Sequence, residues 1–178
     1  LKVVYIESDI DLENEIVLPC NESNIEEALK KSKNAKGIIL TSPNYYGISC
    51  DLEHILRNMK SNGLKIIIDA AHGAHYGVNE NLPKSIAKLA DYTVMSAHKT
   101  LPALTQGAFL MVNDKNSNVE FFISAFNTTS PSYLIMSSLD YSRYYLEKYG
   151  NKDYGELITL AESYKNKINS LNKVSILS

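Results

Sequence analysis

The sequence predicts an α/β fold in which a mostly parallel sheet has helices on both faces and the chain ends in two helices. Short apolar runs of strand length alternate with segments whose apolar residues recur at helical spacing. The runs at 64–68 and 92–95 are continuously apolar, which is typical of strands buried on both faces. This alternation favours a parallel sheet, whose ligands bind at the carboxyl ends of the strands.

The predicted strands are the apolar runs that turn-forming or polar residues bound. They cover residues 2–6, 37–40, 64–68, 92–95 and 107–112. A polar loop with proline and two tyrosines, residues 41–47, follows the second of these strands.

Two helices are predicted between the strands. Ser23 and Glu26 have the spacing of a capping box, which predicts a helix that reaches about Lys33. Apolar residues at helical spacing predict a second helix over 51–62, with Gly63 at its end.

The last third of the chain is predicted to be helical. Ser130 and Pro131 suit the cap and first turn of a helix that ends at Tyr149, before Gly150. A second helix follows, with apolar residues on one face. These residues are Leu157, Leu160, Ala161, Tyr164, Ile168 and Leu171.

Composition limits the classes of function. With 178 residues, a net charge of −2 and a pI near 6.1, the chain lacks the basic character of nucleic-acid or anionic-membrane binders. No apolar run approaches the roughly 20 residues that span a bilayer, and no secretion signal is present. Cys20 and Cys50 lack metal-ligand spacing, and such low cysteine usage predicts a cytoplasmic protein.

Asp69 and Lys99 are the main candidates for chemistry. Each follows an apolar strand, so we expect both at the carboxyl ends of neighbouring strands. Desolvation there disfavours the ammonium form of Lys99 and makes a neutral amine available for a Schiff base. A buried Asp69 carboxylate needs a cationic partner, and a protonated pyridine nitrogen is one. Without the other residue, a lysine in the position of Lys99 is more often an ordinary surface lysine. An aspartate in the position of Asp69 can equally be a strand cap or a metal ligand.

Histidines surround these two residues. His72 and His75 follow Asp69, and His98 precedes Lys99, where they suit hydrogen bonding and proton transfer near neutral pH. A zinc site is disfavoured because no further ligands of suitable spacing follow. The residues from Asp69 to His72 also approximate a helicase box, but the chain has no phosphate-binding loop upstream, so we discard that interpretation.

Four segments carry a resemblance to a known family. They read TSPNYYG (41–47), DAAHGAH (69–75), SAHKTLPALTQ (96–106) and TSPSY (129–133). With Asp69 and Lys99 in place, the chain resembles the pyridoxal-phosphate enzymes of fold type I, and more narrowly the ornithine/lysine/arginine decarboxylases. The lysine segment is the most specific part. Members commonly have Glu where Ala70 stands.

The resemblance implies a role for each matching residue toward pyridoxal 5'-phosphate. Lys99 holds the cofactor covalently, Asp69 pairs with its pyridine nitrogen, and Ala71 packs on the ring. Further roles are implied for residues around these three. His72 lies beside the ring, Ser96 and His98 reach the phosphate, Thr129 or Ser130 contacts the phosphate of a neighbouring subunit, and Tyr45 and Tyr46 line the substrate side.

The resemblance also implies a larger, oligomeric enzyme. Residues 1–150 correspond to part of the transferase-like large domain, and 151–178 to a helix leading toward a C-terminal domain. The chain is then the middle of an enzyme that forms a homodimer or larger homo-oligomer. By itself it is expected to be inactive.

The implied activity is decarboxylation of a basic amino acid, either arginine, lysine or ornithine, to a diamine or polyamine, with Lys99, His72 and His98 as catalytic residues. Two alternatives remain open. Another fold-type-I reaction, such as that of cysteine desulfurases or aminotransferases, also uses a Ser-x-His-Lys segment, although those families usually continue with glycines. The third possibility is a folded core without activity.

Overall fold

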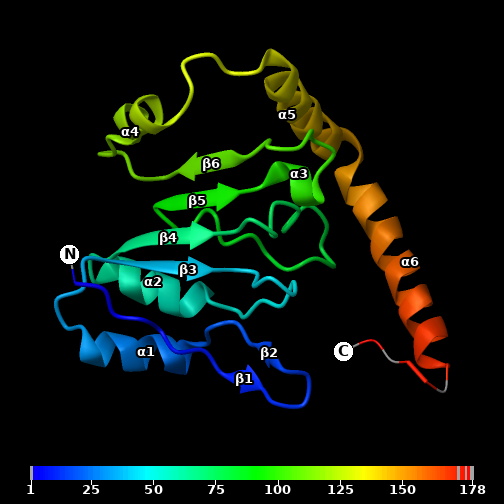
Figure 1. The fold of residues 1–178 in the computed structure, drawn as a ribbon, viewed down its shortest axis with the longest axis horizontal. Helices are drawn as coiled ribbons and strands as arrows, with labels where there is room; N and C mark the ends of the chain where they lie inside the picture. The colour runs from blue at the N-terminus through cyan, green and yellow to red at the C-terminus, as the bar shows by residue number, and fades with distance from the viewer. Residues whose placement is uncertain (1, 172, 175, 177–178) are drawn as a thin grey trace.

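The computed structural model describes residues 2–171, 173, 174 and 176. Its main element is a four-stranded sheet in the order β3-β4-β5-β6 (Figure 1). Strands β3, β4 and β5 are parallel, and β6 pairs with β5 in the antiparallel direction. The predicted α/β class with a mostly parallel sheet is therefore confirmed. The strands are Gly37–Thr41, Lys65–Asp69, Tyr92–Met95 and Phe109–Val112.

The N-terminal segment differs from the prediction. The strand expected at 2–6 is wrong, because residues 2–9 form no strand. Val3 and Tyr5 are 62% and 84% exposed, and Ile6 packs against the core, but no strand pairs with this apolar run. A short antiparallel pair follows instead, formed by β1 (Ile10–Asp11) and β2 (Ile16–Val17). Strand propensity without a pairing edge does not make a strand.

Helix α1 (Glu22–Lys31) begins at a capping box different from the predicted one. Asn21, and not Ser23, is the N-cap: its side chain accepts from the Asn24 amide at 3.0 Å, and Asn24 accepts from the Asn21 amide at 2.9 Å. Asparagine caps helices as well as serine does, so the start shifts by two residues. Helix α2 (Glu53–Ser61) is confirmed within its predicted range.

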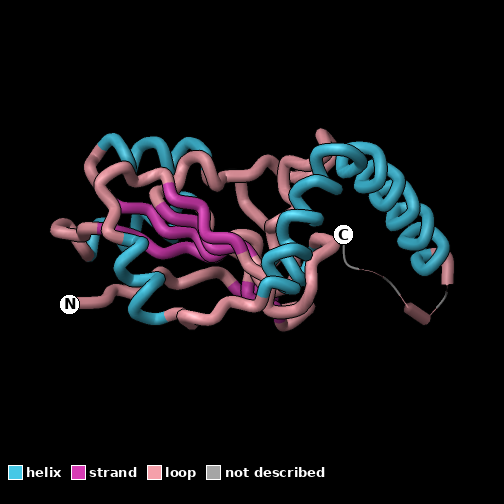
Figure 2. The backbone as a smooth tube through the Cα atoms, turned by 90° about the horizontal axis from the view of Figure 1, so that it is seen from above, coloured by secondary structure: helices cyan, strands magenta, loops and turns pink. Residues whose placement is uncertain are grey.

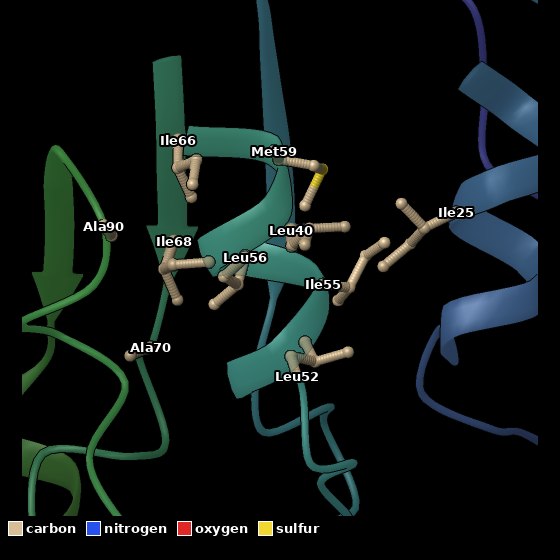
Figure 3. Close-up of a cluster of buried hydrophobic side chains, with 10 residues drawn as sticks. All are labelled: Ile25, Leu40, Leu52, Ile55, Leu56, Met59, Ile66, Ile68, Ala70 and Ala90. Atoms are coloured by element: carbon tan, nitrogen blue, oxygen red, sulfur yellow. The ribbon is translucent and has the colours of Figure 1, made fainter. Parts of the chain in front are cut away.

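Helices α1 and α2 build the hydrophobic core against one face of the sheet. Ile25 of α1 points toward Ile55 of α2, and α2 lies between α1 and the strands (Figure 3). The cluster consists of Ile25, Leu40, Leu52, Ile55, Leu56, Met59, Ile66, Ile68, Ala70 and Ala90. It fixes the position of β3 and β4 relative to the helices.

The second face of the sheet is more open. Ile39, Val94 and Leu110 lie on this face and are 69%, 42% and 37% exposed. At these positions the sheet faces solvent, whereas the sequence predicted helices over both faces. Asp69 lies on the same open face, because it pairs directly with Val94.

Truncating the centre of the core should destabilise the fold strongly. Leu56 is fully buried, so Leu56→Ala is expected to lower the free energy of unfolding by about 2–5 kcal/mol, through lost burial and the cavity left behind. Urea unfolding measures the change. Leu157→Ala, at a site 55% exposed, is the control and should change stability by less than about 0.5 kcal/mol. Equal losses in both variants would contradict this core.

An ion-pair cluster holds the amino ends of the strands together. Lys65 Nζ lies 2.8 Å from Asp114 Oδ2 and 3.5 Å from Asp91 Oδ1. Tyr92 donates its hydroxyl to Asp114 Oδ2 at 2.8 Å, and Asp91 Oδ2 accepts from the Ile66 amide. The hydrogen bonds from Lys65 and Tyr92 lower the pKa of Asp114 from 3.8 to about 2. The cluster therefore fastens β4, β5 and the end of β6 at the edge opposite the candidate site.

This cluster predicts an acid-dependent stability. Because the pKa of Asp114 is depressed in the folded state, its stabilisation is present above pH 3.8 and is lost as the pH falls toward about 2. Across this window, the melting temperature of the wild type should fall more steeply with decreasing pH than that of Asp114→Asn. Tyr92→Phe removes one hydrogen bond and should have an intermediate slope. An Asp114→Asn slope equal to wild type would contradict the assignment.

The C-terminal part of the chain forms a helical rod, sharply bent near its middle in Figure 2, beside the carboxyl ends of the parallel strands (Figures 1 and 2). It consists of α5 (Tyr133–Tyr145), a π-helical turn η1 (Leu146–Gly150) and α6 (Asn151–Asn169). None of the helices in the described part of the chain is long and apolar enough to cross a membrane.

Two predicted boundaries of this rod are wrong. Its N-cap is Ser132, which accepts from the Ile135 amide at 3.4 Å, and not Ser130. Gly150 does not end a helix. It is buried inside the π-turn, where a Cβ would lie 2.7 Å from Val78 Cγ1. Close packing, and not helix termination, explains this glycine. Leu171 lies beyond the end of α6.

The helix that follows β6 was not predicted. Helix α4 (Val119–Phe126) follows β6 in the chain and lies at the end of the sheet away from the rod (Figure 1). Its exposed apolar residues are Phe121, Phe122, Ile123 and Phe126. Its sequence lacks the alternation of apolar and polar residues from which a helix is predicted.

Candidate functional site

The candidate site lies at the carboxyl ends of β3, β4 and β5. Asp69 is the last residue of β4 and pairs with Thr41 on β3 and Val94 on β5. Chain segments that leave these three strands therefore start at one edge of the sheet. The predicted site residues before position 100 lie on these strands or on the segments that follow them.

Asp69 is exposed, which corrects the expectation of a buried carboxylate. It lies on the open face of the sheet. Its Oδ1 accepts from the Ala71 amide at 3.0 Å and so caps the turn after β4. Among the residues that the structure describes, no cationic side chain lies within 4.0 Å of this carboxylate. A charged group is thus available to a ligand.

Lys99 lies on α3 (Ala97–Thr100), a single helical turn that directly follows β5. The residue is exposed, so the desolvation expected from the sequence is absent in this chain. Its backbone is well fixed, because the Leu101 amide donates to the Ala97 carbonyl at 2.8 Å and the Lys99 amide to Ser96 at 3.2 Å. The structure therefore presents a free amine on an anchored turn.

His98 is fixed through Gly107. Its backbone amide and its Nδ1 both donate to the Gly107 carbonyl, at 3.2 and 2.8 Å. Because a carbonyl only accepts, Nδ1 carries the proton, and in the neutral ring Nε2 is the acceptor. Gly107 is close-packed here, since a Cβ would lie 3.0 Å from Leu139 Cδ2 of α5.

The structure brings His72 and the predicted tyrosines together. Tyr45 contacts the His72 ring edge to face, with centroids 5.7 Å apart, and Tyr46 contacts Tyr45 in the same way at 5.6 Å. Tyr45 and Tyr46 are 79% and 54% exposed. The loops after β3 and β4 thus form an aromatic group beside Asp69.

The remaining predicted residues have different surroundings. Ala71 and Ser96 are half-buried at the ends of β4 and β5, and Ser96 is the N-cap of α3. Thr129 and Ser130 are exposed in the connection between α4 and α5, which runs beyond the β6 edge of the sheet (Figure 1). Their cofactor contacts remain predictions. No group of three or more potential metal ligands converges within the described residues.

Sequence reasoning missed Tyr154. This α6 residue stacks on His75, with centroids 5.9 Å apart and ring planes at 17°, and donates its hydroxyl to the Thr100 carbonyl. Burial lowers the pKa of His75 and raises that of Tyr154. Tyr154 is far in the sequence from the predicted site residues, and no local sequence motif marks it.

These features define a class, an α/β protein with a candidate ligand site of exposed charged groups at the carboxyl ends of parallel strands. Comparison with known proteins makes the class specific. Residues 3–178 match the family model described as Orn/Lys/Arg decarboxylase, major domain. The chain belongs to this family.

Curated relatives agree with the family match. The chain is 40% identical over 149 residues to an uncharacterised protein, YaaO, of Bacillus subtilis, covering 81% of this chain and 31% of that protein. It is 33% identical over 174 residues to an arginine decarboxylase of Bacillus anthracis, covering 96% and 35%. An arginine decarboxylase of Halalkalibacterium halodurans is 35% identical over 152 residues, covering 83% and 31%. The chain thus spans about a third of these relatives.

Proposed function

We propose that the protein containing these residues uses pyridoxal phosphate to decarboxylate a basic amino acid to a diamine or polyamine. The observation that carries the proposal is the placement of Asp69 and Lys99 after neighbouring parallel strands, each without an ion-pair partner among the described residues. Family membership supports the decarboxylase class. The relatives named arginine decarboxylase make arginine the first substrate to test, ahead of lysine and ornithine.

The chemistry of the residues fits this cofactor. An aromatic aldehyde with a basic ring nitrogen requires a primary amine at one end and a carboxylate at the other. Lys99 supplies an exposed amine, and Asp69 an exposed carboxylate on the adjacent strand. When bound, the cofactor supplies an electron sink for the bond that breaks at the substrate α-carbon.

The chain's own residues then divide the remaining work. Asp69 keeps a proton on the ring nitrogen by its negative charge. His98, whose ring is held by the hydrogen bond from Nδ1 to the Gly107 carbonyl, would reach the phosphate through Nε2, which donates to a phosphate oxygen when it carries a proton. His72, held against Tyr45, closes one side of the site and orients the substrate carboxylate. Lys99 returns a proton to the product carbon.

The proposal extends to the whole assembly. Residues 1–150 belong to the large domain, and 151–178 lead toward a C-terminal domain. Exposed Thr129 and Ser130 contact the phosphate in a partner subunit of a homodimer or larger assembly. We place the enzyme in the cytoplasm, which is compatible with two free cysteines.

Carbon dioxide release tests the proposal. The protein carrying these residues and the flanking segments that its gene encodes is supplied with pyridoxal phosphate and carboxyl-labelled arginine, lysine or ornithine. Labelled carbon dioxide from at least one substrate is expected. Sulfide from cysteine, or an oxo acid without carbon dioxide, would replace the proposal with another fold-type-I reaction. No product from any of them would favour a folded core without activity.

A further inference from the structure

We propose that Tyr154 is a positioning residue that fixes Lys99 relative to Asp69, an inference that rests on the proposed function only for the roles of those two residues. Tyr154 contacts both segments that leave the site. Its hydroxyl binds the carbonyl of Thr100, the residue after Lys99. Its ring stacks on His75, in the segment that follows Asp69.

The contact with Thr100 completes a very short helix. The last carbonyls of any helix lack partners within the helix. Helix α3 has four residues, so most of its carbonyls depend on outside donors. Tyr154 supplies one on the C-terminal side of Lys99, and Gly107 holds His98 on the other side. The backbone of Lys99 is therefore fixed from both sides while its amine stays free.

The contact with His75 is one of several between the rod and the segment after β4. Asn79 Nδ2 donates to the carbonyl and to Oδ1 of Asn151, at 2.7 and 2.8 Å. The approach is so close that a Cβ on Gly155 would lie 3.1 Å from Asn79 Nδ2, and one on Gly150 2.7 Å from Val78. These glycines bring α6 close enough for Tyr154 to reach both segments.

The π-turn explains why Tyr154 points to the site. A π-turn inserts an extra residue into a helix and rotates everything after it, and such turns often occur near functional sites. Here η1 directly precedes α6, and its Gly150 contacts the segment that carries His75. The turn η1 and helix α6 therefore act as a brace across the segments that follow β4 and β5, with Tyr154 as the contact shared by both segments.

Hydrogen exchange and cofactor binding test the inference in the full-length protein. Tyr154→Phe keeps the stacking ring and removes the hydroxyl, so amides in 97–101 should exchange about five- to tenfold faster, as expected for one lost hydrogen bond. Exchange in β4 should not change. Pyridoxal phosphate should bind about tenfold more weakly if fixing Lys99 relative to Asp69 contributes as much binding free energy as one hydrogen bond. Tyr144→Phe, on the exposed side of the rod, is the control.

A second variant tests the inference independently, in case Tyr154→Phe does not fold. His75→Leu removes the stack but leaves the Thr100 hydrogen bond, so exchange should rise first in 71–79. Unchanged exchange in 97–101 for Tyr154→Phe would overturn the inference, as would faster exchange with unaltered cofactor affinity. If exchange responds as expected but wild type never captures pyridoxal phosphate, the brace stands and the proposed function fails.

Discussion

Lys99→Ala is expected to abolish covalent capture of pyridoxal phosphate and to reduce decarboxylation to background. No other group in the proposed site is a primary amine on the turn after β5, so the aldehyde loses its attachment point. The lost activity should amount to about a thousandfold or more, as for removal of other covalent catalytic groups. The measurement is borohydride reduction followed by peptide mass spectrometry, together with the visible absorbance of the bound cofactor.

Lys115→Ala is the matched control, because Lys115 is also exposed but follows β6, at the edge of the sheet opposite the candidate site. It should keep both the reduced adduct on the 97–106 peptide and the activity. Retention of the covalent adduct in Lys99→Ala, at any other lysine and with activity preserved, would show that Lys99 is not the attachment point. The fold itself should not respond, since an exposed side chain is removed.

Asp69→Asn should leave the cofactor attached and slow turnover by about a hundredfold to a thousandfold, the usual size of a lost electrostatic contact at a reacting centre. Asparagine has the shape of aspartate and an oxygen that still accepts from the Ala71 amide, so the turn after β4 persists. Only the charge that holds the ring-nitrogen proton is lost. Steady-state rates of carbon dioxide release, with the absorbance of bound cofactor, measure the two effects separately.

Asp51→Asn provides a control with the same local geometry. Asp51 is exposed, and its Oδ1 accepts from the Glu53 amide at 3.0 Å, as Asp69 accepts from Ala71 at 3.0 Å. Loss of this charge, on a residue with no proposed role toward the cofactor, should not alter the rate. If Asp69→Asn were as active as Asp51→Asn, the pairing of Asp69 with the cofactor would be wrong.

Much of the fold could be predicted because burial leaves a local record in the sequence. The apolar runs at 64–68 and 92–95 correspond to β4 and β5, and the apolar spacing in 51–62 gives α2. The ends of helices were less predictable. Asn21 competes with Ser23 as a cap, and Gly150 resembles a helix stop although its role is close packing against Val78.

The candidate site was predictable only in part. Asp69 and Lys99 were placed at strand ends from sequence, because polar residues after apolar runs are conspicuous. Their exposure was not predicted, since it depends on what covers the open face of the sheet. Tyr154 could not be found, because its link to His75 and Thr100 joins segments far apart in the chain.

The sequence by itself determined the α/β class, its main strands and the amine and carboxylate that follow two of them, because hydrophobic periodicity and residue chemistry are local properties. Only the tertiary structure decided which face of the sheet stays open and how α6 spans the ends of β4 and β5. Those features arise from contacts between distant segments, such as Gly150 with Val78 and Tyr154 with Thr100, whose free energies no single stretch of sequence contains.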